Sequence, residues 1–125
     1  MVKLIIRDDD LCYYSKVDDI ERIYKEIEGF PISFATIPTV TDVSTVGACP
    51  DTRGNTVPRW IGDNKALSYW LKEKLRKKEI DVLMHGISHG YSFVQGKRLA
   101  EMQWRKELNL KNEIAEQKNK IRNLT

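Results

Sequence analysis

Three consecutive aspartates follow a short apolar run near the start of the chain. Residues 2–6 read Val-Lys-Leu-Ile-Ile, and Asp8, Asp9 and Asp10 come soon after them. A short apolar run of this kind predicts a strand over residues 2–7, buried in a parallel sheet that is covered on both faces. Adjacent carboxylates repel one another unless a cation lies close, so this arrangement costs stability and suggests a functional site. The alternative is a solvated turn in which the aspartates only cap a following helix.

The apolar residues after the aspartates predict alternating helices and strands. A helix is expected over residues 17–27, where apolar residues recur at three- and four-residue steps. Strands are expected over residues 31–37 and 79–84, with a helix capped by Asp63 or Asn64 between them. Strand, helix and strand with short connections favour parallel pairing. The expected fold class is therefore α/β, built from parallel βα units.

Two longer stretches depart from this pattern. Residues 39–62 are rich in Thr, Asp, Ser, Gly and Pro, show no period, and are expected to form a long loop. Arg59 and Trp60 in this loop could contact a ligand, or Trp60 could simply anchor an ordinary surface loop. Residues 98–124 are expected to form a C-terminal helix. Its apolar face would hold Met102, Leu108, Leu110, Ile114 and Ile121.

The basic charge of the chain is confined to its last part. The 125 residues carry a net charge of +3, and residues 97–125 hold 8 Lys/Arg against 4 Asp/Glu. Mixed charges at helical spacing are typical of a solvated helix face, so no nucleic-acid partner is expected. No membrane span and no signal peptide are expected, and Cys12 and Cys49 show neither metal nor redox spacing. We expect one domain, residues 1–125, in the cytoplasm.

Both histidines of the chain lie directly after the third expected strand. His85 and His89 are four residues apart in the stretch His-Gly-Ile-Ser-His-Gly-Tyr. Because the carboxyl ends of parallel strands meet at one edge of a sheet, the imidazoles and the aspartates should lie close together. Two histidines and one aspartate, with positions open to water, form the ligand set of a catalytic divalent-metal site. The alternative is a structural pair of histidines at this spacing by chance.

In these motifs the chain resembles the polysaccharide deacetylases, the NodB-homology proteins of carbohydrate esterase family 4. The family's strand ending in Asp-Asp is matched by Arg-Asp-Asp-Asp-Leu at residues 7–11, and its His-x-x-x-His motif by residues 85–89. Its second strand is similar to Ser-Phe-Ala-Thr-Ile-Pro at residues 33–38. The resemblance covers residues 2 to about 120. It implies that the βα units form the N-terminal part of a (β/α)-barrel of the glycoside hydrolase and deacetylase type.

The resemblance implies a divalent metal, zinc above all, held by one aspartate and the two histidines. The neighbouring aspartate would then be the general base. Three aspartates stand where the family has two, so the register is open. Aligning Arg7 with the residue two before the family's pair makes Asp9 the base and Asp10 the metal ligand. The shifted alternative makes Asp8 the base and Asp9 the ligand.

The activity implied by the resemblance is metal-dependent hydrolysis of acetyl groups on a carbohydrate. Tyr91, with Arg59 and Trp60, is a candidate contact for the acetylated carbohydrate. The family's later strands and its Leu-x-His general-acid motif are absent from this sequence, so we expect part of a longer protein or a naturally short relative. Uncovered sheet edges then predict a homo-oligomer, and the missing general acid predicts negligible activity. The alternative is a metal- or glycan-binding module that does not catalyse.

Overall fold

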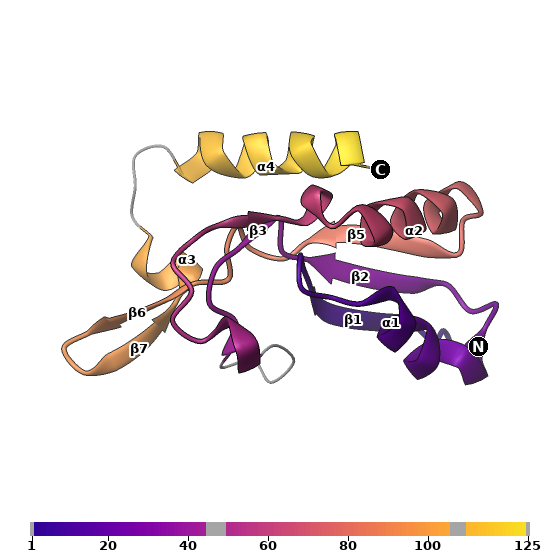
Figure 1. Ribbon diagram of the computed structural model, residues 1–125, viewed down its shortest axis with the longest axis horizontal. Helices are drawn as coiled ribbons and strands as arrows, with labels where there is room; N and C mark the ends of the chain where they lie inside the picture. The colour runs from indigo at the N-terminus through magenta and orange to yellow at the C-terminus, as the bar shows by residue number, and fades with distance from the viewer. Residues whose placement is uncertain (1, 45–49, 106–109, 125) are drawn as a thin grey trace.

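The computed structural model describes residues 2–44, 50–105 and 110–124, and it shows a mixed α/β fold on a parallel sheet of three strands (Figure 1). The strands are β1 (Ile6–Leu11), β2 (Ile32–Thr36) and β5 (Ile80–Met84), with β2 in the centre. Helix α1 (Val17–Tyr24) and the 3₁₀ turn η1 (Lys25–Ile27) lead from β1 to β2, and α2 (Lys65–Arg76) leads into β5. Both strand pairings are parallel, which confirms that part of the predicted fold. These residues do not extend the sheet to a barrel.

The main core lies between the sheet and its two connecting helices. Phe34 of β2 is 1% exposed. Its ring meets Tyr24 of α1 and Trp70 of α2 edge to face, at centroid distances of 5.9 and 5.7 Å. The side chain of Asn64 accepts a hydrogen bond from the N–H of Leu67, which confirms one of the two expected caps of α2. Aromatic contacts from both helices therefore fix the position of the central strand.

The first strand begins later than expected and is not buried on both faces. It starts at Ile6, and the preceding Val2, Leu4 and Ile5 are 96%, 76% and 81% exposed. The three aspartates lie inside the strand instead of beyond its end, and the solvated-turn alternative is equally wrong. A short apolar run looks the same in a buried strand and in an exposed segment, so periodicity could not separate the two.

The expected loop over residues 39–62 is partly ordered as short paired strands. Strand β3 (Thr39–Val40) pairs antiparallel with β4 (Arg59–Trp60), and the 3₁₀ turns are η3 (Pro50–Thr52) and η4 (Ile61–Asp63). Residues 45–49, and with them Cys49, lie outside the described residues. A second hydrophobic cluster lies under this region and comprises Cys12, Ile37, Val40 and Val43. The loop is therefore anchored beside the carboxyl ends of β1 and β2.

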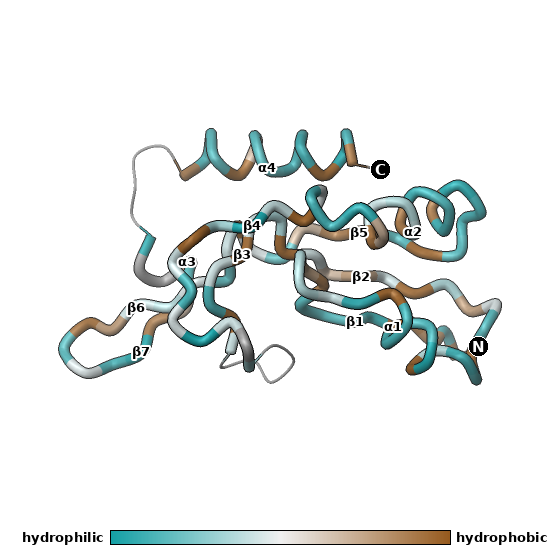
Figure 2. Tube along the Cα trace, viewed as in Figure 1, coloured by the Kyte–Doolittle hydropathy of each residue, from teal (hydrophilic) through white to brown (hydrophobic). Residues whose placement is uncertain are grey.

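The prediction of a single helix over residues 98–124 is wrong for the first part of that range. Strands β6 (Tyr91–Val94) and β7 (Lys97–Ala100) form a hairpin that projects from the body, followed by the short helix α3 (Glu101–Trp104) (Figure 1). Helix α4 (Leu110–Leu124) remains, and its hydrophobic residues face the rest of the molecule (Figure 2). Of the expected inner face, Ile121 is buried, Met102 is 48% exposed and Leu108 lies outside the described residues. In the described part of the chain, no helix has the length and apolarity to cross a membrane.

Candidate metal centre

A β-bulge in β1 presents Asp10 to the end of the neighbouring strands. The pairing of β1 with β2 runs through Asp8 and Phe34 and resumes at Leu11 and Thr36, so two residues of β1 oppose one of β2. Asp10 has a φ of +71°, a region that residues other than glycine enter with strain. Bulges of this kind re-aim a side chain and are frequent beside active sites. The carboxylate is therefore placed by backbone geometry.

The two histidines come from the turn that follows β5. The N–H of His85 donates to the carbonyl of Thr36 at 2.7 Å, which extends the β2–β5 pairing by one residue. His89 has a φ of +56°, so a second residue of the site lies in the left-handed region. The two imidazole rings are 5.1 Å apart, with their planes inclined by 33°. The sheet therefore fixes the first histidine, and the turn fixes the second.

One oxygen of Asp10 and one nitrogen of each histidine form a compact cluster. Oδ1 of Asp10 lies 3.3 Å from Nε2 of His85 and 3.2 Å from Nε2 of His89. In a tetrahedral zinc site with bonds of about 2.0–2.1 Å, neighbouring ligand atoms lie about 3.3–3.4 Å apart. The observed separations are close to that value. Oδ1 of Asp10 is also buried without a hydrogen-bond partner among the described residues, which a cation would satisfy.

The other two aspartates have different partners. Asp8 accepts a hydrogen bond of 2.6 Å from the hydroxyl of Tyr24, and burial together with this bond raises the pKa of the tyrosine. Asp9 is more exposed and accepts two hydrogen bonds from Arg7, at 2.5 and 2.8 Å. These bonds hold the pKa of Asp9 below its ordinary value, and the charges of the two histidines act in the same direction. Of the three carboxylates, only that of Asp10 belongs to the cluster.

A buried carboxylate that the sequence analysis missed holds the histidine turn. Glu101, 5% exposed, begins α3. Its Oε2 accepts from the N–H groups of Ile87 and His89, at 2.8 and 3.1 Å. Its Oε1 accepts from the N–H and the hydroxyl of Ser88, at 2.9 and 2.6 Å. Burial acts to raise the pKa of Glu101, but these hydrogen bonds outweigh it and the pKa is lowered.

The three candidate substrate contacts are not equally placed. The ring of Tyr91 lies 5.7 Å from that of His89 in an edge-to-face contact, so it borders the cluster. The guanidinium of Arg59 lies 5.7 Å from the ring of Tyr13, and Trp60 packs against the main core. Among the described residues, neither Arg59 nor Trp60 forms a hydrogen bond, an ion pair or a ring contact with the cluster. Tyr91 is therefore the best placed of the three.

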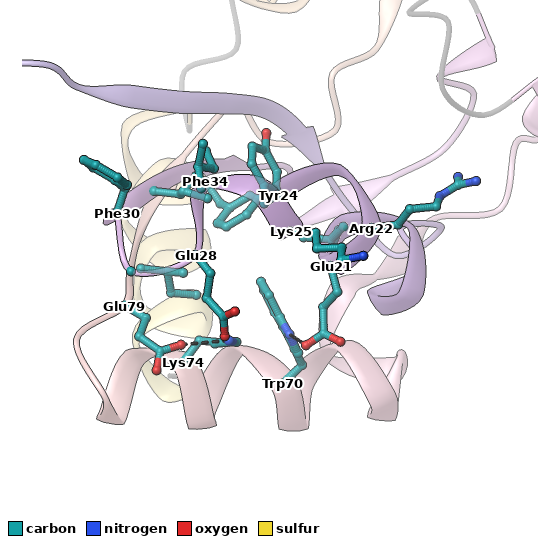
Figure 3. A pocket seen from close by; sticks show the side chains of 15 residues that line it. Glu21, Arg22, Tyr24, Lys25, Glu28, Phe30, Phe34, Trp70, Lys74 and Glu79 are labelled. Carbon is teal, nitrogen blue, oxygen red and sulfur yellow. Dashed lines mark hydrogen bonds and ion pairs between the residues drawn. The ribbon is translucent and has the colours of Figure 1, made fainter.

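A separate cavity of about 470 Å³ lies at the other end of the sheet, between α1 and α2 (Figure 3). Ile32 and Ile80, which begin β2 and β5, line it together with Tyr24, Phe34 and Trp70. Its polar rim includes Lys74, which donates a hydrogen bond of 2.7 Å to Glu79. No predicted site residue lines this cavity, so the hollow and the polar cluster occupy opposite ends of the strands.

The donor set of the cluster, one carboxylate oxygen and two imidazole nitrogens, is one that divalent transition metals accept. Three protein ligands leave room in a four-coordinate site for water or substrate, as in catalytic zinc centres. No protein-family model, no curated protein and no solved structure matches the chain.

Proposed function

We propose that the chain is a metal-dependent hydrolase domain that removes acetyl groups from a carbohydrate, in the manner of the polysaccharide deacetylases. The observation that carries the proposal is the Asp10, His85 and His89 cluster with a further carboxylate, Asp9, next to it in the chain. The acetylated carbohydrate comes from the resemblance of residues 7–11 and 85–89 to the deacetylase motifs. The same resemblance supports the view that the three-stranded sheet is the first part of a (β/α)-barrel.

Asp9 is the proposed general base. Zinc bound by the cluster would supply a water of lowered pKa and would polarise the acetyl carbonyl. Asp9 reaches solvent, and its hydrogen bonds from Arg7 keep it ionised and hold its orientation. Both of its oxygens accept from Arg7, so Asp9 must release one of these bonds when it takes the proton of that water. Asp8 also has a partner, since Oδ2 of its carboxylate accepts the Tyr24 hydroxyl. Asp9 is preferred because it is the more exposed of the two and lies next to Asp10 in the chain.

The three central N–H groups of the histidine turn are not free to donate to a tetrahedral oxyanion. The N–H groups of Ile87, Ser88 and His89 all donate to Glu101. Both histidines of the sequence belong to the cluster, so no third histidine can protonate the leaving amine. We therefore expect slow acetate release from this chain. The same observation favours the second candidate function, a metal- or glycan-binding domain that does not catalyse.

Calorimetric titration with Zn²⁺ tests the metal site. We expect the wild type to bind one equivalent, and His85→Ala and His89→Ala to lose more than about 100-fold in affinity, because each removes a direct ligand. The control is Asp81→Asn, which changes an exposed carboxylate of β5 outside the cluster and should bind as the wild type does. Equal affinity in the wild type and the histidine variants would refute the site.

Acetate release from acetylated sugar oligomers, with Zn²⁺ or Co²⁺ supplied, then separates the two functions. We expect metal-dependent release well below about 1 per second. Binding of the oligomer without any release would favour the non-catalytic domain, and release that a chelator does not affect would exclude the proposed mechanism.

Self-association of the chain is part of the same proposal. The exposed Val2, Leu4 and Ile5 beside the edge strand β1 support it, and a monomeric mass by light scattering would contradict it.

A further inference from the structure

Three successive backbone N–H groups converge on the carboxylate of Glu101. They belong to Ile87, Ser88 and His89, and the hydroxyl of Ser88 adds a fourth donor. Successive N–H groups arranged in this way form an anion-binding nest. Here the anion is the side chain of Glu101, which follows the β6–β7 hairpin in the chain. The turn between the histidines is therefore folded around Glu101.

The contacts require a group that only accepts hydrogen bonds. Each carboxylate oxygen of Glu101 receives two donors, so neither oxygen can be replaced by an NH₂ group without setting a donor against a donor. A glutamine at this position would keep the shape of the side chain and lose part of the hydrogen bonding whichever way its amide turned. A Glu101→Gln substitution would therefore change the hydrogen bonding at this position with little change in side-chain volume.

Gly86 gives independent evidence that the turn is built around this carboxylate. Its φ is +71°, and a Cβ added there would lie 2.6 Å from Oε2 of Glu101. The backbone therefore passes the carboxylate at a distance that only glycine permits. On the other side, Arg105 lies 3.7 Å from Oε1 of Glu101 and 3.1 Å from Glu113 of α4. These ion pairs connect the buried carboxylate to the C-terminal helix.

The two histidines depend on different supports. His85 is held by its backbone hydrogen bond to Thr36 in the sheet. The backbone of His89 is in a strained conformation, and its N–H is bound by Glu101. A strained conformation persists only where the surroundings over-determine it. The 3.2 Å separation between Nε2 of His89 and Oδ1 of Asp10 therefore depends on the hydrogen bonds of Glu101.

We propose that Glu101 is a positioning residue of the metal cluster, which sets the place of His89 without touching the metal. The inference rests on the proposed metal site. Outer partners that hold a metal-binding histidine usually do so through its ring nitrogen, and their loss costs about 10–100-fold in metal affinity. Glu101 acts instead through the backbone of the turn, so it fixes the direction from which the imidazole approaches.

The test compares Glu101→Gln with Glu116→Gln. Both remove one negative charge, but Glu116 lies on the surface of α4, where it forms an ion pair with Lys120, four residues later. Zn²⁺ affinity is measured by calorimetry, and the visible absorption of the Co²⁺-loaded protein reports the coordination geometry. We expect Glu101→Gln to lose about 10–100-fold in Zn²⁺ affinity and to change the Co²⁺ spectrum. Glu116→Gln should match the wild type in both.

Each outcome has a defined meaning. If Glu101→Gln is folded by circular dichroism and keeps the affinity and the spectrum of the wild type, the inference is overturned, even if its thermal stability falls. If Glu101→Gln does not fold, Ser88→Ala replaces it, since it removes the hydroxyl donor to Oε1 and, besides this, the acceptor of one long hydrogen bond of 3.4 Å from the N–H of Gly90. A Zn²⁺ affinity several-fold weaker is then expected, and an unchanged affinity overturns the inference. Failure of the wild type to bind Zn²⁺ would instead refute the metal site itself.

Discussion

The carboxyl end of the β1-β2-β5 sheet carries polar side chains on strained backbone, and the amino end carries aromatic side chains around a cavity. Asp10 and His89 both have positive φ, and hydrogen bonds hold the turn between the histidines. At the other end, Phe34 and Trp70 are placed by ring contacts and side-chain packing. Backbone conformation therefore places the candidate site, whereas side-chain packing forms the amino end. Substitutions at the carboxyl end should change metal binding, stability or both, and those at the amino end should change stability alone.

The largest expected effect separates the three aspartates. Asp10→Asn should weaken Zn²⁺ binding by more than about 100-fold, since it removes the charge of the proposed carboxylate ligand. Asp9→Asn should spare the affinity and reduce acetate release. Asp8→Asn should leave the affinity unchanged and lower the free energy of unfolding by about 1 kcal/mol, because its bond with Tyr24 loses the carboxylate charge. Calorimetry and urea unfolding distinguish these outcomes. If the alternative assignment is right, in which Asp8 is the base and Asp9 the ligand, Asp9→Asn will lose Zn²⁺ binding instead.

An intermediate effect is expected from two glycines with similar backbone conformation. Gly86 has a φ of +71° and Gly96 of +75°, so an alanine at either position pays a comparable backbone strain. Only at Gly86 would the added Cβ meet Oε2 of Glu101, at 2.6 Å, whereas nothing lies within 4 Å at Gly96. Gly86→Ala should lower the free energy of unfolding by about 1–3 kcal/mol more than Gly96→Ala. Equal losses in urea unfolding would mean that Glu101 moves aside without cost.

The smallest effect is expected at the amino end, in the pair of Lys74 and Glu79. Their hydrogen bond lowers the pKa of Glu79 from its ordinary value of 4.5 and raises that of Lys74 from 10.5. The contribution of Glu79 is therefore present above about pH 4.5 and is lost as the pH falls through the lowered pKa. That of Lys74 is present below about pH 10.5 and is lost as the pH rises through the raised pKa.

Urea unfolding of the wild type and Glu79→Gln at pH 7 and pH 3 checks this prediction. The difference in stability between the two proteins should be small at pH 7, because both partners are partly exposed, and smaller still at pH 3. Zn²⁺ affinity should be the same in both proteins. A loss of Zn²⁺ binding in Glu79→Gln would contradict the view that the amino end of the sheet does not affect the metal cluster.

Elements defined by local sequence could be predicted, and elements defined by distant contacts could not. The parallel pairing of β2 with β5 and the Asn64 cap of α2 follow from hydrophobic period and capping chemistry. The β6–β7 hairpin was missed because its turn is Gln95–Gly96, which is not one of the usual hairpin pairs, and because β7 from Arg98 onward was assigned to the charged C-terminal helix. The start of β1 was misplaced because burial of a short apolar run depends on what covers it.

The same distinction applies within the candidate site. Asp10 and the histidines could be predicted because parallel strands bring their carboxyl ends together, a rule that sequence order alone can use. Glu101 could not, since its partners lie 12 to 14 residues earlier, across a hairpin that was itself missed. A run of three aspartates gives no sequence signal for the bulge that re-orients Asp10. Sequence order therefore predicts which side chains gather, and tertiary contacts decide how they are aimed.

The place of β2 between β1 and β5 has a consequence for how the protein folds. Asp10 comes from one edge strand and the histidines follow the other, so the cluster forms only after both pairings with β2 exist. Such non-local pairings are slow steps in folding. A cation bound there is a ligand of the native state alone, and at a hundredfold excess over its Kd it would add about 2.7 kcal/mol to the free energy of unfolding. Metal supply would thereby raise the fraction of molecules that are folded at equilibrium, in addition to serving any chemistry at the cluster.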